Sequence, residues 1–255
     1  MKSFSLSRRL GTAAILASAL ALPAQAGLIT NGGFESGFSS WSLDDQVGSN
    51  GGFSIQTGNA SPLLGLPVPV PPFGANAAMT DSEAGGSHVL YQDFVVPVAL
   101  TSYTLSFSLF INNGDVDFRA PATLDWGTQV LNQQARVDII TTTADVFSVG
   151  AADVLQSIYQ TNAGDALTSG YNTLTFDISA LLQAHQGQTL RLRFAEVDNV
   201  SYFNLGVDNV DIVAGTPTSN VPESLPWFME WATLTSVILA GIAYHRTNRR
   251  AIAST

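Results

Sequence analysis

Cysteine is absent from this 255-residue sequence, which excludes a disulfide framework and thiolate chemistry. Basic residues are also scarce, because 10 Lys and Arg stand against 20 Asp and Glu. Between residues 27 and 220 only four arginines face 18 carboxylates, a net charge of −14. Nucleic-acid binding needs a basic surface to neutralise phosphates, so this composition excludes that class and opposes docking on anionic lipid.

Sequence signatures of catalysis are missing as well. No G-x-S-x-G elbow, H-E-x-x-H helix or glycine-rich phosphate loop is present. His88 follows Gly-Gly-Ser at the start of a predicted strand, where a structural hydrogen-bonding role is expected. Glycoside hydrolysis would need two carboxylates about 5–9 Å apart. The sequence offers candidates by residue type only, and most are expected to be solvated loop charges: Glu35, Asp44, Asp45, Glu83, Glu196 and Asp198.

Strand signals dominate residues 27–213. In the stretch 103–111, Tyr, Leu, Phe, Leu and Ile alternate with Thr, Ser and Ser, the period of two that marks a half-buried strand. Further strands are predicted at 88–96, 135–140, 171–178, 189–194 and 203–213. In the last of these the apolar face changes parity at Asp208–Asn209, which predicts a β-bulge there. The fold class expected for residues 27–214 is an all-β, antiparallel jelly-roll sandwich.

Three other segments carry local signals. A short helix is predicted over 180–185, capped by Ser179 and ended by Gly187, and a second over 151–159. The proline-rich stretch SPLLGLPVPVPPF, residues 61–73, favours an extended conformation. It is too apolar for a solvated linker, so we expect it to cover core, with the rim of a ligand groove as the alternative.

The N-terminus has the three parts of a secretory signal peptide. Lys2, Arg8 and Arg9 are followed by the apolar run 10–22 and by the A-x-A site that Ala24 and Ala26 form. Residues 1–26 are therefore expected to be removed by signal peptidase, and the protein to be exported.

Two motifs near the ends of the exported part resemble a known class. LITNGGFESGFSSWS, residues 28–42, and FNLGVDNVDI, residues 203–212, resemble the paired end strands of extracellular jelly-roll modules related to carbohydrate-binding modules. The resemblance implies a structural calcium ion between opening and closing strands, and Glu35 and Asp208 match its ligands. The alternative is that both carboxylates only accept backbone hydrogen bonds at strand ends.

The C-terminus resembles the PEP-CTERM sorting signal of bacterial surface proteins. Val221, Pro222 and Glu223 match its motif, Ser224 replaces the second proline, and Glu230 interrupts the apolar run. Residues 215–220 would be a linker, 221–250 the signal with a transmembrane helix at about 225–244, and 251–255 a cytoplasmic tail. The resemblance implies cleavage by an exosortase and release to the cell surface. A permanent membrane anchor is the alternative.

Sugar binding requires flat aromatic side chains that stack on pyranose rings. Trp126, in the loop-like stretch TLDWGTQ, is the first candidate, against the alternative that it packs inward. Trp41 is expected to pack in the core. The sequence thus predicts a non-catalytic exported surface or matrix protein of the bacterial envelope that binds polysaccharide. A secreted carbohydrate-active hydrolase and a membrane-anchored binding protein are the competing hypotheses.

Overall fold

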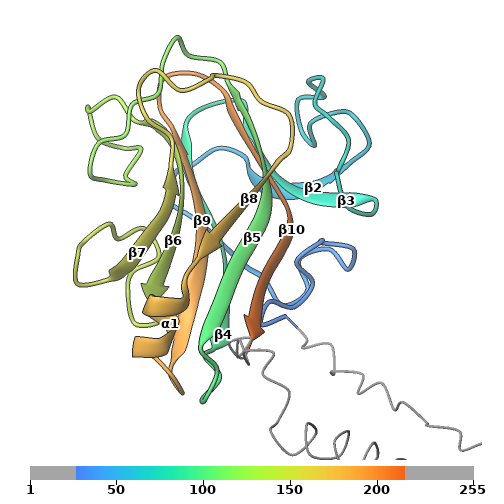
Figure 1. Cartoon of the computed structure of the whole chain (residues 1–255). Coiled ribbons are helices and arrows are strands. Elements are labelled where there is room, and N and C mark those ends of the chain that lie inside the picture. Colours follow the sequence, from blue (N-terminus) through green and yellow to red (C-terminus); the bar gives the residue numbers. More distant parts are fainter. Residues whose placement is uncertain (1–26, 216–255) are drawn as a thin grey trace, which may run out of the picture. The chain divides into compact units, whose positions relative to one another are not determined.

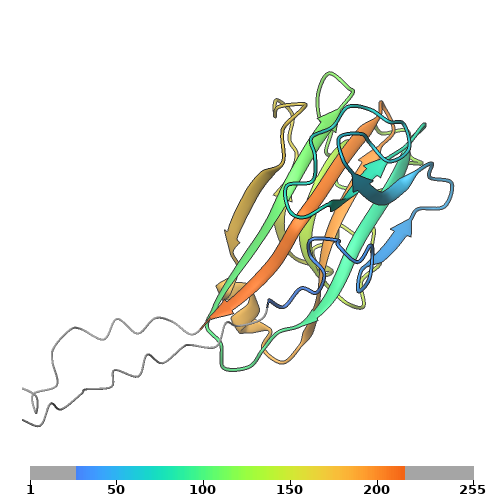
Figure 2. The same cartoon turned by 90° about the vertical axis from the view of Figure 1, so that its right-hand side faces the viewer.

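The computed structural model describes residues 27–215, which form two five-stranded antiparallel sheets packed face to face (Figures 1 and 2). The first sheet has the strand order β1 (Ser42–Asp45), β4 (Gly86–Val95), β9 (Thr189–Asp198), β6 (Gln133–Thr141) and β7 (Val154–Gln160). The second has the order β2 (Gly52–Thr57), β3 (Asn76–Asp81), β10 (Phe203–Gly215), β5 (Ser102–Asn113) and β8 (Asn172–Asp177).

The strand order identifies the topology. Apart from the neighbours β6 and β7, which pair within the first sheet, consecutive strands from β3 to β10 change sheet. The result is β3-β10-β5-β8 opposite β4-β9-β6-β7, the eight-stranded double Greek key of a jelly roll. Strands β1 and β2 each extend one sheet at its edge. The predicted jelly-roll sandwich is confirmed.

The alternating side chains of β5 and β9 form the centre of the core. Tyr103, Leu105 and Phe107 are fully buried, as the period of two predicts. Phe107 makes an edge contact with Phe194 of the opposite sheet, with ring centroids 5.3 Å apart. The core therefore lies between the two sheets, as expected for a sandwich.

The predicted bulge in β10 is present. Pairing with β5 shifts register between Asp208 and Asp211, and Asn209 adopts a left-handed φ of 51°. The extra residue lets both Val207 and Val210 point inward and become buried, although they differ in parity.

The opening motif folds as a tight turn. Asn31 holds it, because its side chain accepts from the Ser36 backbone and donates to the carbonyls of Gly37 and Ser39. Trp41 donates its indole N–H to the Asn31 carbonyl and is 7% exposed. Core packing of Trp41 is confirmed.

The helix prediction for 151–159 is wrong. That segment contains strand β7, which pairs with β6 across two register shifts. An open edge of β6 supplies backbone partners that a short isolated helix lacks. The helix α1 (Ser179–Ala184) is confirmed, but Ser179 does not cap it: its hydroxyl accepts from the Tyr103 backbone instead.

The proline-rich segment lies between β2 and β3 and covers part of the second sheet. Val68 is buried there against Met79 and Phe110, and Asp81 accepts from the backbone N–H groups of Leu63 and Leu64. The covering role is confirmed.

The predicted signal peptide with Ala24 and Ala26, the sorting motif at 221–223 and the transmembrane helix lie outside the described residues, 27–215. Of the predicted linker, 215–220, only Gly215 is described, and it is the last residue of β10. Within that range, no helix is long and apolar enough to cross a membrane.

Candidate functional site

One end of the sandwich gathers loops that join β3 to β4, β5 to β6 and β9 to β10. The last two of these loops lie at the upper end of Figure 1, opposite α1. Their surfaces enclose two small hollows, of about 210 Å³ and 390 Å³. The two hollows share Gly85 and Asn199, so they adjoin. We call them the Tyr202 hollow and the Trp126 hollow.

Hydrogen bonds to the Trp126 backbone hold the loop that lines the Trp126 hollow. The Trp126 backbone N–H donates to the side chains of Gln46 and Ser87, and its carbonyl accepts from Asn199. The ring packs on a buried apolar cluster on the outer side of the first sheet: Val89, Leu124, Ala195 and Val197. Its indole nitrogen is buried without a partner. Trp126 is therefore half-buried, with one part packed inward and another lining the hollow.

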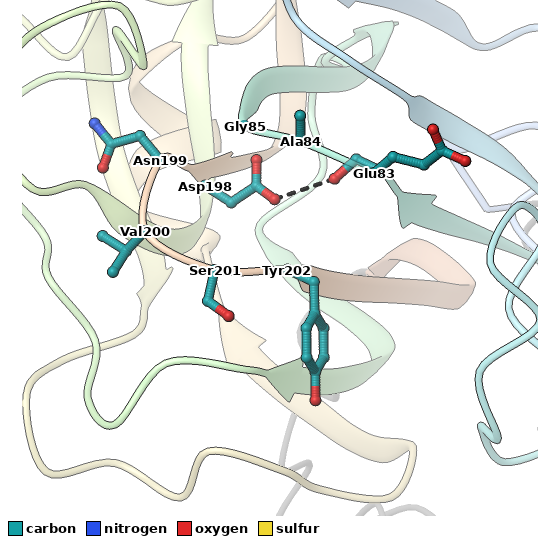
Figure 3. A pocket seen from close by; sticks show the side chains of 9 residues that line it. Glu83, Ala84, Gly85, Asp198, Asn199, Val200, Ser201 and Tyr202 are labelled. Atoms are coloured by element: carbon teal, nitrogen blue, oxygen red, sulfur yellow. Dashed lines mark hydrogen bonds between the residues drawn. The ribbon is translucent and has the colours of Figure 1, made fainter.

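The aromatic side chain that lines the Tyr202 hollow is more exposed than Trp126. Tyr202 is 44% exposed and projects beside Ser201 (Figure 3). Its ring lies over Gly114, where an added Cβ would come within 2.3 Å of the ring. Any larger residue at 114 would displace the ring, since no contact so short occurs in real structures. Tyr202 was not singled out from the sequence; the polar stretch Asp198–Ser201 before it was the available signal.

The acidic hydrolase candidates do not form a facing pair in these hollows. Asp198 is 1% exposed and accepts hydrogen bonds from the Ser82 hydroxyl at 3.1 Å and the Gly86 backbone at 2.7 Å. Glu83 lines the same hollow, but its side chain points away from Asp198 (Figure 3). Asp44 is an exposed residue of β1, as expected for a solvated charge.

Glu196 and Asp198 differ from the expectation of solvated loop charges, because both are buried. They lie near the end of β9 and continue its inward face beyond Phe194. The period of two that begins at Leu190 and Leu192 was the signal for this.

Glu35 and Asp208, the predicted calcium ligands, both hold the segment before β3. Glu35 accepts from the backbone N–H groups of Ala75 and Asn76, and Asp208 from that of Phe73 at 3.0 Å. Burial, followed by the Glu35 charge, raises the pKa of Asp208 to about 6 although backbone hydrogen bonds oppose the shift. Two carboxylates that repel each other fit a cation chemically, but calcium takes six to eight oxygens. Backbone carbonyls would have to supply most of the others.

If Glu35 and Asp208 bind calcium, the ion should stabilise the protein through this pair. An ion present at a hundredfold excess over its Kd stabilises by about 2.7 kcal/mol, so a chelator should lower the melting temperature. Asp208→Asn keeps the size of the side chain and should remove the response, as measured by differential scanning calorimetry. An unchanged melting curve in chelator would leave Glu35 and Asp208 as acceptors of backbone hydrogen bonds.

The sequence matches no protein-family model and no curated protein. Solved structures with a similar fold include TmCBM61 in complex with β-1,4-galactotriose, at 12% identity and TM-score 0.44, covering 74% of this chain and 99% of that one. The K3 cleaved adhesin domain of Lys-gingipain from Porphyromonas gingivalis has 14% identity and TM-score 0.43, with coverage of 74% and 98%. A Stig cyclase from Fischerella has 16% sequence identity and a TM-score of 0.45, and the match covers 76% of this chain and 98% of that one.

Proposed function

We propose that the protein is an exported, non-catalytic surface protein that binds a neutral glycan at the adjoining Trp126 and Tyr202 hollows. The observation that carries the proposal is the pair of aromatic side chains, one in each hollow, on loops held by the rigid sandwich. Aromatic rings offer flat apolar surface for the C–H faces of sugars. Ser201, Thr128 and Gln129 add polar groups within the same hollows, which could fix orientation through hydrogen bonds.

The negative charge of the protein favours a neutral ligand over an anionic one. The described residues carry four arginines against 18 carboxylates, and Glu83 stands in the Tyr202 hollow. An anionic polysaccharide would meet repulsion from both. The two volumes are at or below the low end of the roughly 300–1,000 Å³ typical of small-molecule sites, which favours recognition of a short segment or a chain end.

A non-catalytic role is supported by the orientation of the carboxylates. A hydrolase needs two of them facing one cleft at a set separation, whereas Glu83 points away from Asp198 and Asp198 is buried. Export, exosortase sorting and delivery to the envelope are supported by the sequence of residues 1–26 and 221–250. A permanent membrane anchor would place the same hollows outside the cell.

Binding of neutral glycans tests the proposal. Screening the protein against a neutral glycan panel should identify a weak ligand whose Kd changes little with salt, since stacking is not screened as charge pairs are. Trp126→Ala and Tyr202→Ala should each weaken binding by about 2 kcal/mol, about thirtyfold in Kd, as measured by isothermal titration calorimetry.

Tyr159→Ala is the matched control. Tyr159 lines a different hollow, with Leu109, Asp165 and Asn172 among its walls, so its removal should leave the affinity unchanged. Melting curves check that each variant remains folded. Absence of any bound glycan, or a loss of binding in Tyr159→Ala alone, would contradict the assignment.

A further inference from the structure

Four polar side chains at the loop end of the first sheet form a cluster that glycan binding does not use. The strand register sets Asp45 of β1 opposite His88 of β4, and His88 opposite Glu196 of β9. Asp198 follows two residues later on the same strand, opposite Gly86. Since side chains alternate along a strand, Glu196 and Asp198 share one face. Three strands thus bring one imidazole and three carboxylates together.

The inner members of the cluster are buried and incompletely bonded. His88, Glu196 and Asp198 are 0%, 1% and 1% exposed, and one donor atom from each lies within 4.8 Å of the other two. His88 Nε2 and Glu196 Oε1 have no hydrogen-bond partner. A buried polar atom without a partner costs about 1–3 kcal/mol, and more when it is charged.

Hydrogen bonds orient His88 and Asp198, two of the three buried side chains. Asp45 Oδ1 lies 2.7 Å from His88 Nδ1. An N–H donated from Nδ1 to this carboxylate leaves the lone pair on Nε2 free to bind an ion. The ring then extends over Gly86, where an added Cβ would lie 2.3 Å from Nε2, so only glycine leaves room for it. Asp198 is fixed in turn by Ser82 and the Gly86 backbone.

Within residues 27–215, no arginine or lysine pairs with the cluster, and His88 is its one basic member. The described residues contain four arginines and no lysine, and all four arginines pair with other carboxylates: Arg119 with Asp115, Arg136 and Arg193 with Asp138, and Arg191 with Asp93. Burial, with added repulsion from Asp198 and Asp45, raises the pKa of Glu196 well above its ordinary value. Burial likewise raises the pKa of Asp198 to about 7. Either protons or a cation must balance these carboxylates.

We propose that His88 Nε2, Glu196 and Asp198 bind a divalent transition-metal ion of the Zn²⁺ class, with Asp45 orienting the histidine. A metal-bound histidine that donates its other N–H to a carboxylate is the usual outer-shell arrangement of such sites. Calcium and magnesium prefer oxygen ligands alone, whereas imidazole with carboxylates suits zinc. Neighbouring ligand atoms in tetrahedral zinc sites lie about 3.3–3.5 Å apart, so small side-chain movements would close the site.

Asp198 also lines the Tyr202 hollow, which gives the ion a route from solvent. Three protein ligands leave the fourth tetrahedral position for water. The ion would join β1, β4 and β9 at the end of the sandwich that carries the loops, and it would do so whether or not a glycan binds there.

Zinc binding tests the proposal without reference to glycans. Protein dialysed against excess Zn²⁺ and then against metal-free buffer should retain one equivalent by elemental mass spectrometry, and Zn²⁺ should raise its melting temperature while Mg²⁺ should not. Asp45→Asn should weaken zinc binding about 10- to 100-fold. Glu196→Gln should abolish the response yet melt no lower than the wild-type protein in the absence of metal, because glutamine has nearly the same size and cannot carry the charge that burial opposes.

His185→Gln is the matched control for His88→Gln. His185 is the only other histidine among residues 27–215, and it lies next to α1, at the opposite end of the sandwich (Figure 1). Retention of zinc by His185→Gln and its loss from His88→Gln would support the site. Absence of retained zinc in the wild-type protein, or equal retention by His88→Gln, would overturn the proposal and leave protons as the balancing charge.

Discussion

Replacing Asp138 by alanine is expected to destabilise the protein by about 3–5 kcal/mol. Asp138 is fully buried on β6 and accepts two hydrogen bonds from Arg136, each 2.7 Å long, and one from Arg193. Removal of the carboxylate would leave two buried guanidinium groups without their counter-charge. Burial already lowers the pKa of Arg193, against the opposing effect of Asp138. Urea unfolding measures the loss.

Asp93→Ala is the matched control. Asp93 and Arg191 form a bidentate pair on the same sheet, but Asp93 is 39% exposed. Arg191 keeps its stacking on Tyr91 in this variant, and pairs accessible to water contribute about 0–1 kcal/mol. Equal losses of unfolding free energy in Asp138→Ala and Asp93→Ala would show that the buried carboxylate contributes no more to stability than the accessible one.

The consequences of Asp138→Ala should reach the proposed glycan site. Arg193 also donates to the carbonyls of Val146 and Ser148, in the loop whose apolar residues pack on the cluster that carries Trp126. Hydrogen exchange in residues 142–153 should therefore rise more than the global loss of stability requires.

Phe107→Ala is expected to cost about 3–5 kcal/mol, the range for truncation of a fully buried aromatic residue. Its ring contacts Phe194 of the first sheet and stacks on Phe176 of β8, with centroids 5.6 Å apart. The cavity would open between the sheets, where neither can collapse without shifting the other. Chemical denaturation gives the size of the loss.

Phe176→Ala serves as the comparison. Phe176 belongs to the outermost strand of its sheet and is only partly buried, so its truncation should cost about half as much. A larger loss in Phe176→Ala than in Phe107→Ala would mean that the centre of the core lies elsewhere.

The sequence was informative where one face of a strand is buried and the other is polar. Strands β5 and β9 and the bulge in β10 follow from such patterns in the sequence, whereas the covering role of the proline-rich segment follows from its apolar content. Strands β1 and β3 gave no such signal. All residues of β1 are exposed, and five of the six residues of β3 are buried, so neither alternates. The segment of β7, VLQSIYQ, mixes apolar and polar residues without alternation, and six of its seven residues are partly buried. Only an open edge of β6 decides that it is a strand.

For the candidate sites, too, the sequence indicated some features and only the tertiary structure decided the others. Residue type and a loop-like neighbourhood were enough to single out Trp126, while its partly inward packing depends on Val89 of β4 and Val197 of β9, two other segments of the chain. His88 and Glu196 are 108 positions apart in the sequence. Their proximity exists only because β4 and β9 pair in one register, and a shift of one residue would place Glu196 on the other face of the sheet. The sequence determined which residues could carry charge or stack on a sugar. The pairing of the strands decided which of these residues meet. Hydrogen-bond register is a property of two segments together, so the sequence of either segment alone does not determine it.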